Sequence, residues 1–211
     1  MHEELIRRTL EAAILASSEP IAATRLAELF APEEEVGAAD IAAALQALKD
    51  DCVQRGIALT EVASGWRYQV AADIHPRLLR LQTERPSRYS RALLETLALI
   101  AYRQPITRGE IEQIRGVVVS TTIIRTLEER EWIRVVGQRD VPGRPALYGT
   151  TRQFLDYFNL RALDELPPLA AIRDLEEIAP QLDLDVGASA PATATTPLPR
   201  AADDDSMEPT A

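Results

Sequence analysis

The chain has 211 residues, 46% of them hydrophobic, which is enough for one or two globular domains. Its single cysteine, Cys52, and two histidines, His2 and His75, exclude an internal disulfide and disfavour a zinc site of thiolate and imidazole ligands. The net charge of −10 is uneven, because residues 77–152 carry +6 between segments of −7 and −9, a pattern typical of a surface that binds nucleic acid or an acidic protein.

The first 70 residues predict three helices followed by a two-stranded hairpin. Apolar residues recur at helical spacing near the N-terminus, and Pro20 ends that helix. Thr24 and Asp40 are the predicted N-caps of the second and third helices. The expected elements are helices over residues 3–17, 25–30 and 41–55 and strands over residues 57–62 and 66–70.

After a joining segment over residues 74–90, which begins with a short helix over 74–82, the same order recurs. Ser90 is the predicted N-cap of a helix that runs to residue 102. Thr107 and Glu110 form a capping-box pattern that begins the next helix, and Gly116 ends it. A third helix starts at Ser120 or Thr121, and strands follow over residues 133–138 and 146–150.

The two halves also share a residue pattern at a constant offset of 85 positions. Pro20 matches Pro105, and the aliphatic positions pair as Ile21 with Ile106, Leu26 with Ile111 and Leu29 with Ile114. Three helices followed by a β-hairpin wing are the winged-helix arrangement. We therefore predict a mainly α chain with small β wings, built from two tandem winged-helix domains and ending in a disordered acidic, Pro- and Ala-rich tail.

The predicted boundaries follow these patterns. They are an N-terminal domain over residues 1–82, a linker over 83–89, a C-terminal domain over 90–169 and an extension over 170–211. Residues 187–211 consist largely of Ala, Pro, Thr and Asp, which leaves little to bury. No apolar run approaches 18 residues and no signal-peptide layout is present, so a soluble cytoplasmic protein without membrane contact is expected.

The stretches "ALLETLALIAYRQPITRGEIEQIRG" and "VGQRDVPGRPALYGTTRQFLDYFNLRALDELPPL" strongly resemble the segregation and condensation protein B (ScpB) family. The resemblance implies a homodimer of double winged-helix subunits that binds the kleisin subunit ScpA, and through it an SMC ATPase. It further implies a role in chromosome condensation and segregation at the nucleoid, with DNA contacted only indirectly or weakly and without cofactors. Relatives usually carry an Asn-Ser-Asp-like run where this chain has Val117 to Thr122. A partner contact made by the polar side chains of that run is therefore not expected to carry over to this chain.

Candidate partner-binding residues lie in the second domain, and each has a structural alternative. Arg144, in the predicted wing turn, is either solvated or part of an interface. Arg103 and Arg115 end helices, where they would also stabilise the helix dipole. Phe158 follows Phe154 and Tyr157 at helical spacing, which favours core packing over a groove for a partner helix. The full set is Tyr102, Arg103, Arg115, Arg144, Pro145, Tyr148 and Phe158.

Neither third helix has the basic character that a DNA-reading helix needs, because acidic residues offset Arg125 and Arg130 in the second domain. A winged-helix transcription regulator is nevertheless the alternative function. No nucleophile, P-loop or metal motif indicates an enzyme. In the first domain, alanines exceed what one small core needs and indicate a dimerisation face: Ala12, Ala13, Ala16, Ala42, Ala43 and Ala44.

Overall fold

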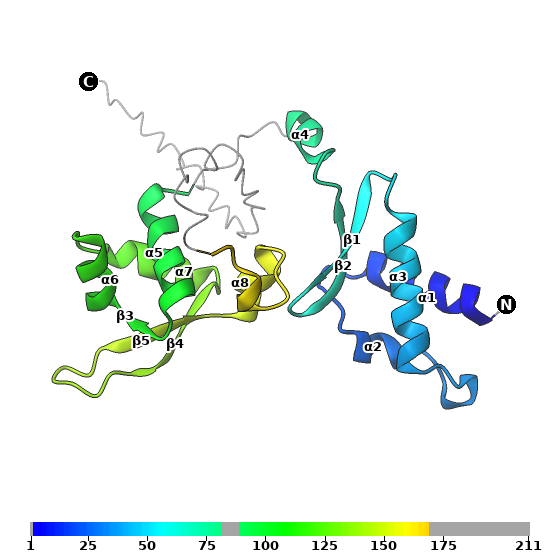
Figure 1. The fold of residues 1–211 in the computed structure, drawn as a ribbon, viewed down its shortest axis with the longest axis horizontal. Coiled ribbons are helices and arrows are strands. Elements are labelled where there is room, and N and C mark those ends of the chain that lie inside the picture. The colour runs from blue at the N-terminus through cyan, green and yellow to red at the C-terminus, as the bar shows by residue number, and fades with distance from the viewer. Residues whose placement is uncertain (1, 82–88, 169–211) are drawn as a thin grey trace, which may run out of the picture.

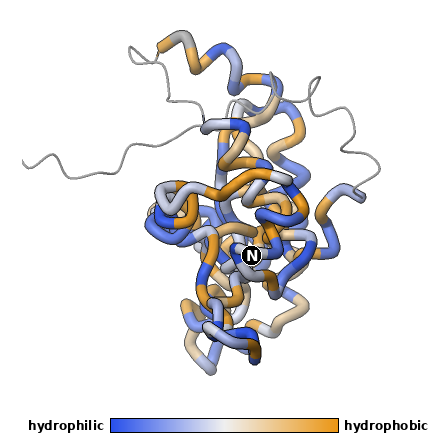
Figure 2. The backbone as a smooth tube through the Cα atoms, turned by 90° about the vertical axis from the view of Figure 1, so that its left-hand side faces the viewer, coloured by the Kyte–Doolittle hydropathy of each residue, from blue (hydrophilic) through white to orange (hydrophobic). Residues whose placement is uncertain are grey.

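The computed structural model describes residues 2–81 and 89–168, and the predicted C-terminal tail lies outside them. Helices and two small antiparallel sheets form two units, each with its own hydrophobic core (Figure 1). We call residues 2–81 the N-terminal unit and residues 89–168 the C-terminal unit. Apolar and hydrophilic residues alternate in short stretches along the backbone of both units (Figure 2), and no described helix is long and apolar enough to cross a membrane.

The N-terminal unit packs three α-helices against a hairpin. Ile6, Leu10 and Ile14 recur on one face of the first helix and are almost fully buried, which is the helical period that the sequence predicts. Leu26 from the second helix is fully buried in the same core. The elements are α1 (His2–Ala16), α2 (Ala23–Ala27), a 3₁₀ turn η1 (Pro32–Glu34), α3 (Ala38–Asp51), β1 (Ile57–Val62), β2 (Gly65–Val70), α4 (His75–Leu78) and η2 (Leu79–Leu81).

Two predicted N-caps in this unit are wrong. Helix α2 begins at Ala23, so Thr24 lies inside its first turn, and the N-cap residue Ala22 has no side-chain cap. Helix α3 begins three residues before the predicted start, with Gly37 as N-cap. The Asp40 carboxylate instead reaches back from the first turn and accepts the Gly37 N–H at 2.8 Å. The sequence pattern correctly indicated that Asp40 caps the helix, but it placed Asp40 before the first turn, whereas the residue lies within that turn.

The hairpin β1–β2 is tied to the segment that follows α1. Ile21 and Trp66 exchange two backbone hydrogen bonds, of 3.0 and 2.8 Å, in an isolated antiparallel bridge. Gly65 makes this approach possible, because its φ is 140° and a Cβ there would lie 2.2 Å from the Ile21 backbone. The wing of the N-terminal unit is therefore fixed to the α1–α2 junction.

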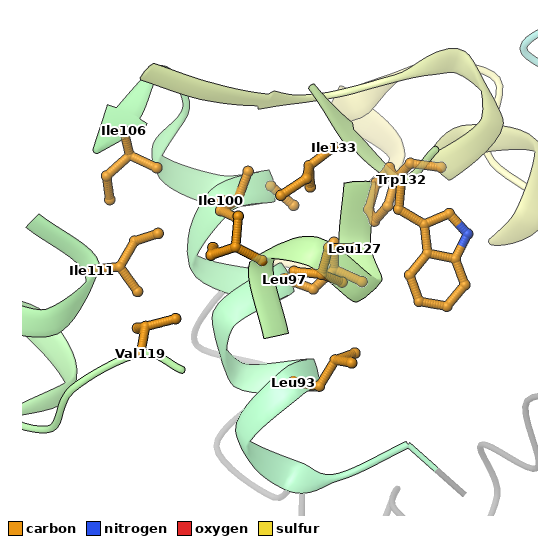
Figure 3. Packing of buried hydrophobic residues seen from close by; sticks show 12 residues of the cluster. Leu93, Leu97, Ile100, Ile106, Ile111, Val119, Leu127, Trp132 and Ile133 are labelled. Carbon is orange, nitrogen blue, oxygen red and sulfur yellow. The ribbon is translucent and has the colours of Figure 1, made fainter. Parts of the chain in front are cut away.

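The C-terminal unit repeats the order with an additional short strand and a terminal helix. Its core side chains come from each of its α-helices and from the two outer strands, with Leu97 and Ile100 among them (Figure 3), whereas the central strand contributes the half-buried Tyr148. The strand order is β3-β5-β4, so β5 is the central strand. The elements are α5 (Arg91–Arg103), β3 (Ile106–Thr107), α6 (Arg108–Arg115), α7 (Thr121–Glu129), β4 (Ile133–Gln138), β5 (Ala146–Thr150), α8 (Arg152–Tyr157) and a 3₁₀ turn η3 (Leu163–Glu165).

The predicted helix ends in this unit are confirmed. The side chains of Ser90, Thr107 and Ser120 accept backbone N–H groups at the starts of α5, α6 and α7. Glu110 completes the capping box by accepting the Thr107 N–H at 2.8 Å. Gly116 ends α6 in the left-handed conformation, with a φ of 71°.

The sequence repeat corresponds to a structural one. Ile106 pairs with Tyr148 across β3 and β5, as Ile21 pairs with Trp66 in the first unit. Leu26 and Ile111 are both fully buried, whereas Leu29 and Ile114 are 50% and 54% exposed. The constant offset does not extend into the first helices, because Leu15 is exposed while its counterpart Ile100 is fully buried.

Candidate partner-binding surface

Strand β5 is the centre of the candidate surface. It pairs with β3 on one side and β4 on the other, with a register shift between Val135 and Gly137. Its far end is held to α5, because the side chain of Gln104 accepts the Thr150 N–H at 2.7 Å and donates to the Thr150 hydroxyl at 2.9 Å. The position of β5 is thus fixed at its centre and at its C-terminal end.

The wing that leads into β5 is also held in place. The Arg139 N–H donates to the Pro145 carbonyl at 2.9 Å, and the Arg144 N–H donates to Val141 at 2.9 Å. Arg144 has a φ of 38° and is exposed, as is Pro145. These hydrogen bonds fix the backbone of the wing turn, and the Arg144 side chain is exposed to solvent there.

Most arginines of the C-terminal unit are neutralised by carboxylates. Four of these pairs join residues four positions apart, such as Arg108 with Glu112 at 3.0 Å. Two more connect separate elements: Arg139 with Glu110 at 2.6 Å and Arg115 with Glu95 at 3.0 Å. Fewer unpaired arginines are therefore available to a partner than the net charge of this segment implies.

Four of the remaining arginines lie before, beside or after β5. Four exposed arginines have no ion-pair partner within the described residues, and we call them the β5 arginines: Arg103, Arg134, Arg144 and Arg152. Arg144 precedes the strand and Arg152 follows it, each by two residues. Arg134 lies on β4 opposite Gly149, and Arg103 precedes the Gln104 that binds Thr150. Arg134 and Arg152 were not among the residues that the sequence singled out.

Two tyrosines of the predicted set are half-buried beside this charge. Tyr148, in the middle of β5, packs against the core, and burial raises the pKa of its hydroxyl. Burial likewise raises the pKa of Tyr102, whose hydroxyl donates to the Pro167 carbonyl at 2.5 Å. Both phenols are therefore neutral, and each offers apolar area with one polar atom, a combination common at interfaces.

Two other predicted site residues have structural contacts. The side chain of Arg115 is 9% exposed and joins α6 to α5 through Glu95 and the Thr96 hydroxyl. Phe158 is half-buried, with its ring centroid 4.8 Å from that of Phe154 and 5.6 Å from that of Trp132. Arg144 and Pro145 thus lie before β5, Tyr148 lies within it and Arg103 lies next to the residue that binds its far end, whereas Arg115 and Phe158 lie in internal packing.

The N-terminal unit presents a second candidate surface on α1 and α3. Leu5 and Leu15 are 51% and 56% exposed on α1, and they share its outer side with Ala12 and Ala16. On α3, Ala42 and Ala43 are exposed, whereas Ala44 is buried. Ala13 is half-buried against the core. Four of the six predicted alanines are therefore available to a partner.

Helix α7, the third helix of the C-terminal unit, has an outer face of balanced charge. Arg125 pairs with Glu129 at 2.7 Å, and Glu128 is exposed beside them. Arg130 lies over the rings of Tyr89 and Trp132, 4.7 and 5.6 Å from their centroids. Within residues 2–81 and 89–168, no three His, Cys, Asp or Glu side chains are grouped to hold a metal ion.

Comparison with known proteins identifies the family. The model of the "Segregation and condensation complex subunit ScpB" family matches residues 8–169. A segregation and condensation protein B homolog from Coxiella burnetii is 57% identical over 172 residues, which are 82% of each chain. Segregation and condensation protein B from Syntrophotalea carbinolica is 38% identical over 187 residues, which are 87% of this chain and 92% of its own.

A solved structure, that of ScpB from Mycobacterium tuberculosis, is 35% identical and covers 75% of this chain and 97% of its own. Its TM-score of 0.34 is too low for the superposition to carry an argument, so the assignment depends on sequence. The family match spans both units and includes all four β5 arginines. The chain therefore belongs to the family of the segregation and condensation complex subunit ScpB.

Proposed function

We propose that this chain is a non-enzymatic subunit of a bacterial condensin-like complex. It forms a homodimer and binds the kleisin subunit ScpA, through which it associates with the SMC ATPase and supports chromosome condensation and segregation. The observation that carries the proposal is the family match over residues 8–169, which includes nearly all described residues. In this role the protein is cytoplasmic, associates with the nucleoid and contacts DNA only indirectly or weakly.

Each unit is, in this proposal, a winged-helix domain. Three α-helices followed by an antiparallel hairpin occur in both units, and the segment that follows the first helix pairs with the second hairpin strand in both. The domains extend over residues 1–82 and 90–169, joined by a linker at 83–89. The proposed extension over residues 170–211 lies outside the described residues.

The dimer interface that we propose is the outer face of α1 and α3. Its exposed apolar side chains are small or unbranched at Cβ, which permits close helix approach in a two-fold arrangement. Light scattering of the full chain should give the mass of a dimer, and Leu5→Glu with Leu15→Glu should give a monomer. Val118→Glu is the matched control, because Val118 is also apolar and is 77% exposed in the C-terminal unit. If the Leu5→Glu, Leu15→Glu variant still has the mass of a dimer, the dimer interface is not on this face of α1.

The kleisin site that we propose is the surface around β5. Four unpaired arginines favour an acidic segment, and Tyr148 and Tyr102 supply apolar contact area beside them. Pro145 fixes the end of the wing, while Arg115 and Phe158 maintain the fold beneath. Charge attraction of this kind accelerates association, and its effect decreases as salt screens it.

Isothermal titration of ScpA from the same genome into the wild-type chain and the Arg144→Glu variant tests this site. We expect weaker binding by the variant, with a larger loss at low salt, while circular dichroism reports an intact fold. Arg25→Glu makes the same charge change on the N-terminal unit and should bind as the wild type does. Unchanged binding by Arg144→Glu at both salt concentrations would remove the wing from the site.

A further inference from the structure

The tip of the first hairpin is bound to the C-terminal unit. The turn between β1 and β2 has two consecutive amides, of Ala63 and Ser64, whose hydrogen bonds go to the other unit. The Ala63 N–H donates to the Leu160 carbonyl at 2.9 Å, and the Ser64 N–H donates to the Asp156 carboxylate at 2.9 Å. In Figure 1 this end of the hairpin lies beside α8.

An arginine of the same hairpin makes two more bonds to that end of α8. One terminal nitrogen of Arg67 donates to the Asp156 carbonyl at 2.7 Å and to the Asn159 side-chain oxygen at 2.8 Å. Asn159 accepts from a left-handed backbone conformation, with a φ of 57°, which asparagine tolerates better than most residues. A guanidinium suits the last turn of a helix, where carbonyl groups concentrate negative charge.

Asp156 is a buried acidic residue at the contact between the two units. It is 5% exposed, and the hydrogen bond that its carboxylate accepts comes from Ser64 in the other unit. A buried carboxylate without a donor is strongly unfavourable, so the Ser64 N–H offsets part of the cost of removing the Asp156 carboxylate from water when the two units are in contact. Within the described residues of the C-terminal unit, no donor bonds to the Asp156 carboxylate.

The contact is also small and polar, which determines how it behaves. Its rim contains an exposed ion pair, Arg161 with Glu61 at 3.8 Å, of a type that contributes little. Polar interfaces of limited size between units of one chain typically permit relative motion. The four hydrogen bonds at the hairpin tip therefore hold the units together without making the arrangement irreversible.

We propose that these groups form a latch that sets the relative orientation of the two units and that opens as one switch. The latch consists of Ala63, Ser64 and Arg67 on the hairpin and Asp156, Asn159 and Leu160 on the other unit. When it opens, the Asp156 carboxylate and the Arg67 guanidinium become hydrated, and the units reorient. This inference stands apart from the proposed function, because it depends only on contacts within one chain.

Distances between two spin labels test the latch in the full chain. Labels are placed on Val53→Cys and Val118→Cys, which are 80% and 77% exposed in different units, in a Cys52→Ala background. Labelled chains are mixed with a large excess of unlabelled ones, so that distances within one subunit are read. The closed latch predicts a single narrow distance distribution, and Arg67→Ala with Asp156→Ala should broaden it.

Two control variants separate the latch from general weakening of the interface. Glu61→Ala removes only the exposed ion pair and should leave the distribution narrow. Asp156→Asn keeps an oxygen that accepts the Ser64 N–H and should restore most of the narrow component. Thermal melting confirms that both units remain folded, and Arg67→Ala alone serves if the double variant does not fold. A distribution that is already broad in the wild type, or that is equally narrow in the latch variants, would overturn the proposal.

Discussion

Arg139 and Glu110 join the wing of the C-terminal unit to the start of α6, with 2.6 Å between the guanidinium and the carboxylate. The same carboxylate accepts the N–H and the hydroxyl of Thr107 as part of the capping box. One side chain therefore stabilises a helix start and positions the wing that carries Arg144. The Thr107 N–H, followed by Arg139, lowers the pKa of Glu110 to about 2.

This pKa predicts a specific loss of stability in acid. The pKa of Glu110 is lower in the folded chain than the ordinary value of 4.5, so its ionised form favours folding. The contribution is complete above about pH 5 and is lost as the pH falls toward 2, the folded-state pKa. We expect the Glu110→Gln variant to show a smaller decrease in melting temperature between these limits than the wild type.

Glutamine keeps an oxygen for the capping box but does not titrate, so the comparison isolates the charge. The control is Glu128→Gln, because Glu128 is exposed on α7 and takes part in no described ion pair. Parallel acid profiles for the wild type and Glu110→Gln would contradict the linkage.

A second prediction contrasts two threonines that the sequence treats alike. Thr107 is the N-cap of α6 and is 4% exposed, whereas Thr24 lies within α2 and caps nothing. Thr107→Ala should lower the free energy of unfolding by about 1 kcal/mol, the usual effect of a lost cap. Thr24→Ala should change it little, because alanine is the better helix former. Urea titrations measure both, and equal losses would mean that Thr24 has a capping role in solution.

The repeated pattern made much of the local structure predictable. Strands β1, β4 and β5 begin and end where alternation and turn residues predict, and three of the five predicted helix caps are correct. The errors at helix starts concern Ala22 and Gly37, where no polar N-cap side chain marks the boundary, and the second and third helices also end earlier than predicted, at Ala27 and Asp51. The two-residue strand β3 was not predicted, because its pairing with β5 joins residues about 40 positions apart in the sequence.

The candidate surface was only partly predictable, because charge on a sequence does not reveal which charges are paired. Arg108 and Arg125 each have a glutamate four residues later, which predicts their neutralisation on a helix. The pairing of Arg115 with Glu95 and of Arg139 with Glu110 depends on how helices and wing meet in space. For the same reason no sequence pattern indicates the bond between Ser64 and Asp156, which are 92 positions apart.

A third prediction uses the repeat as an internal control. Leu26 and Ile111 occupy equivalent, fully buried positions, so Leu26→Ala and Ile111→Ala should each destabilise their own unit by about 2–5 kcal/mol. Leu29 and Ile114, one turn later, are half exposed, and alanine there should cost no more than about 0.5 kcal/mol. Hydrogen exchange read separately over each unit would assign the effects. Loss of protection in both units from one buried substitution would show that they unfold together.

The last prediction separates two arginines that both end helices. The Arg115 side chain is 9% exposed and bonds to Glu95 and Thr96, so Arg115→Ala removes a charged link and buried packing between α6 and α5. We expect a loss of about 1–3 kcal/mol in the free energy of unfolding. Arg103 is exposed and has no ion-pair partner within the described chain, so Arg103→Ala should leave stability unchanged.

Binding to ScpA should show the opposite order if the surface around β5 is the partner site. Arg103→Ala should weaken binding at low salt, whereas Arg115→Ala should bind nearly as the wild type does at temperatures where it remains folded. Urea titration and calorimetry on the same two variants provide both readouts. A variant pair in which Arg115→Ala loses binding and keeps full stability would transfer the partner site from β5 to the junction of α5 and α6.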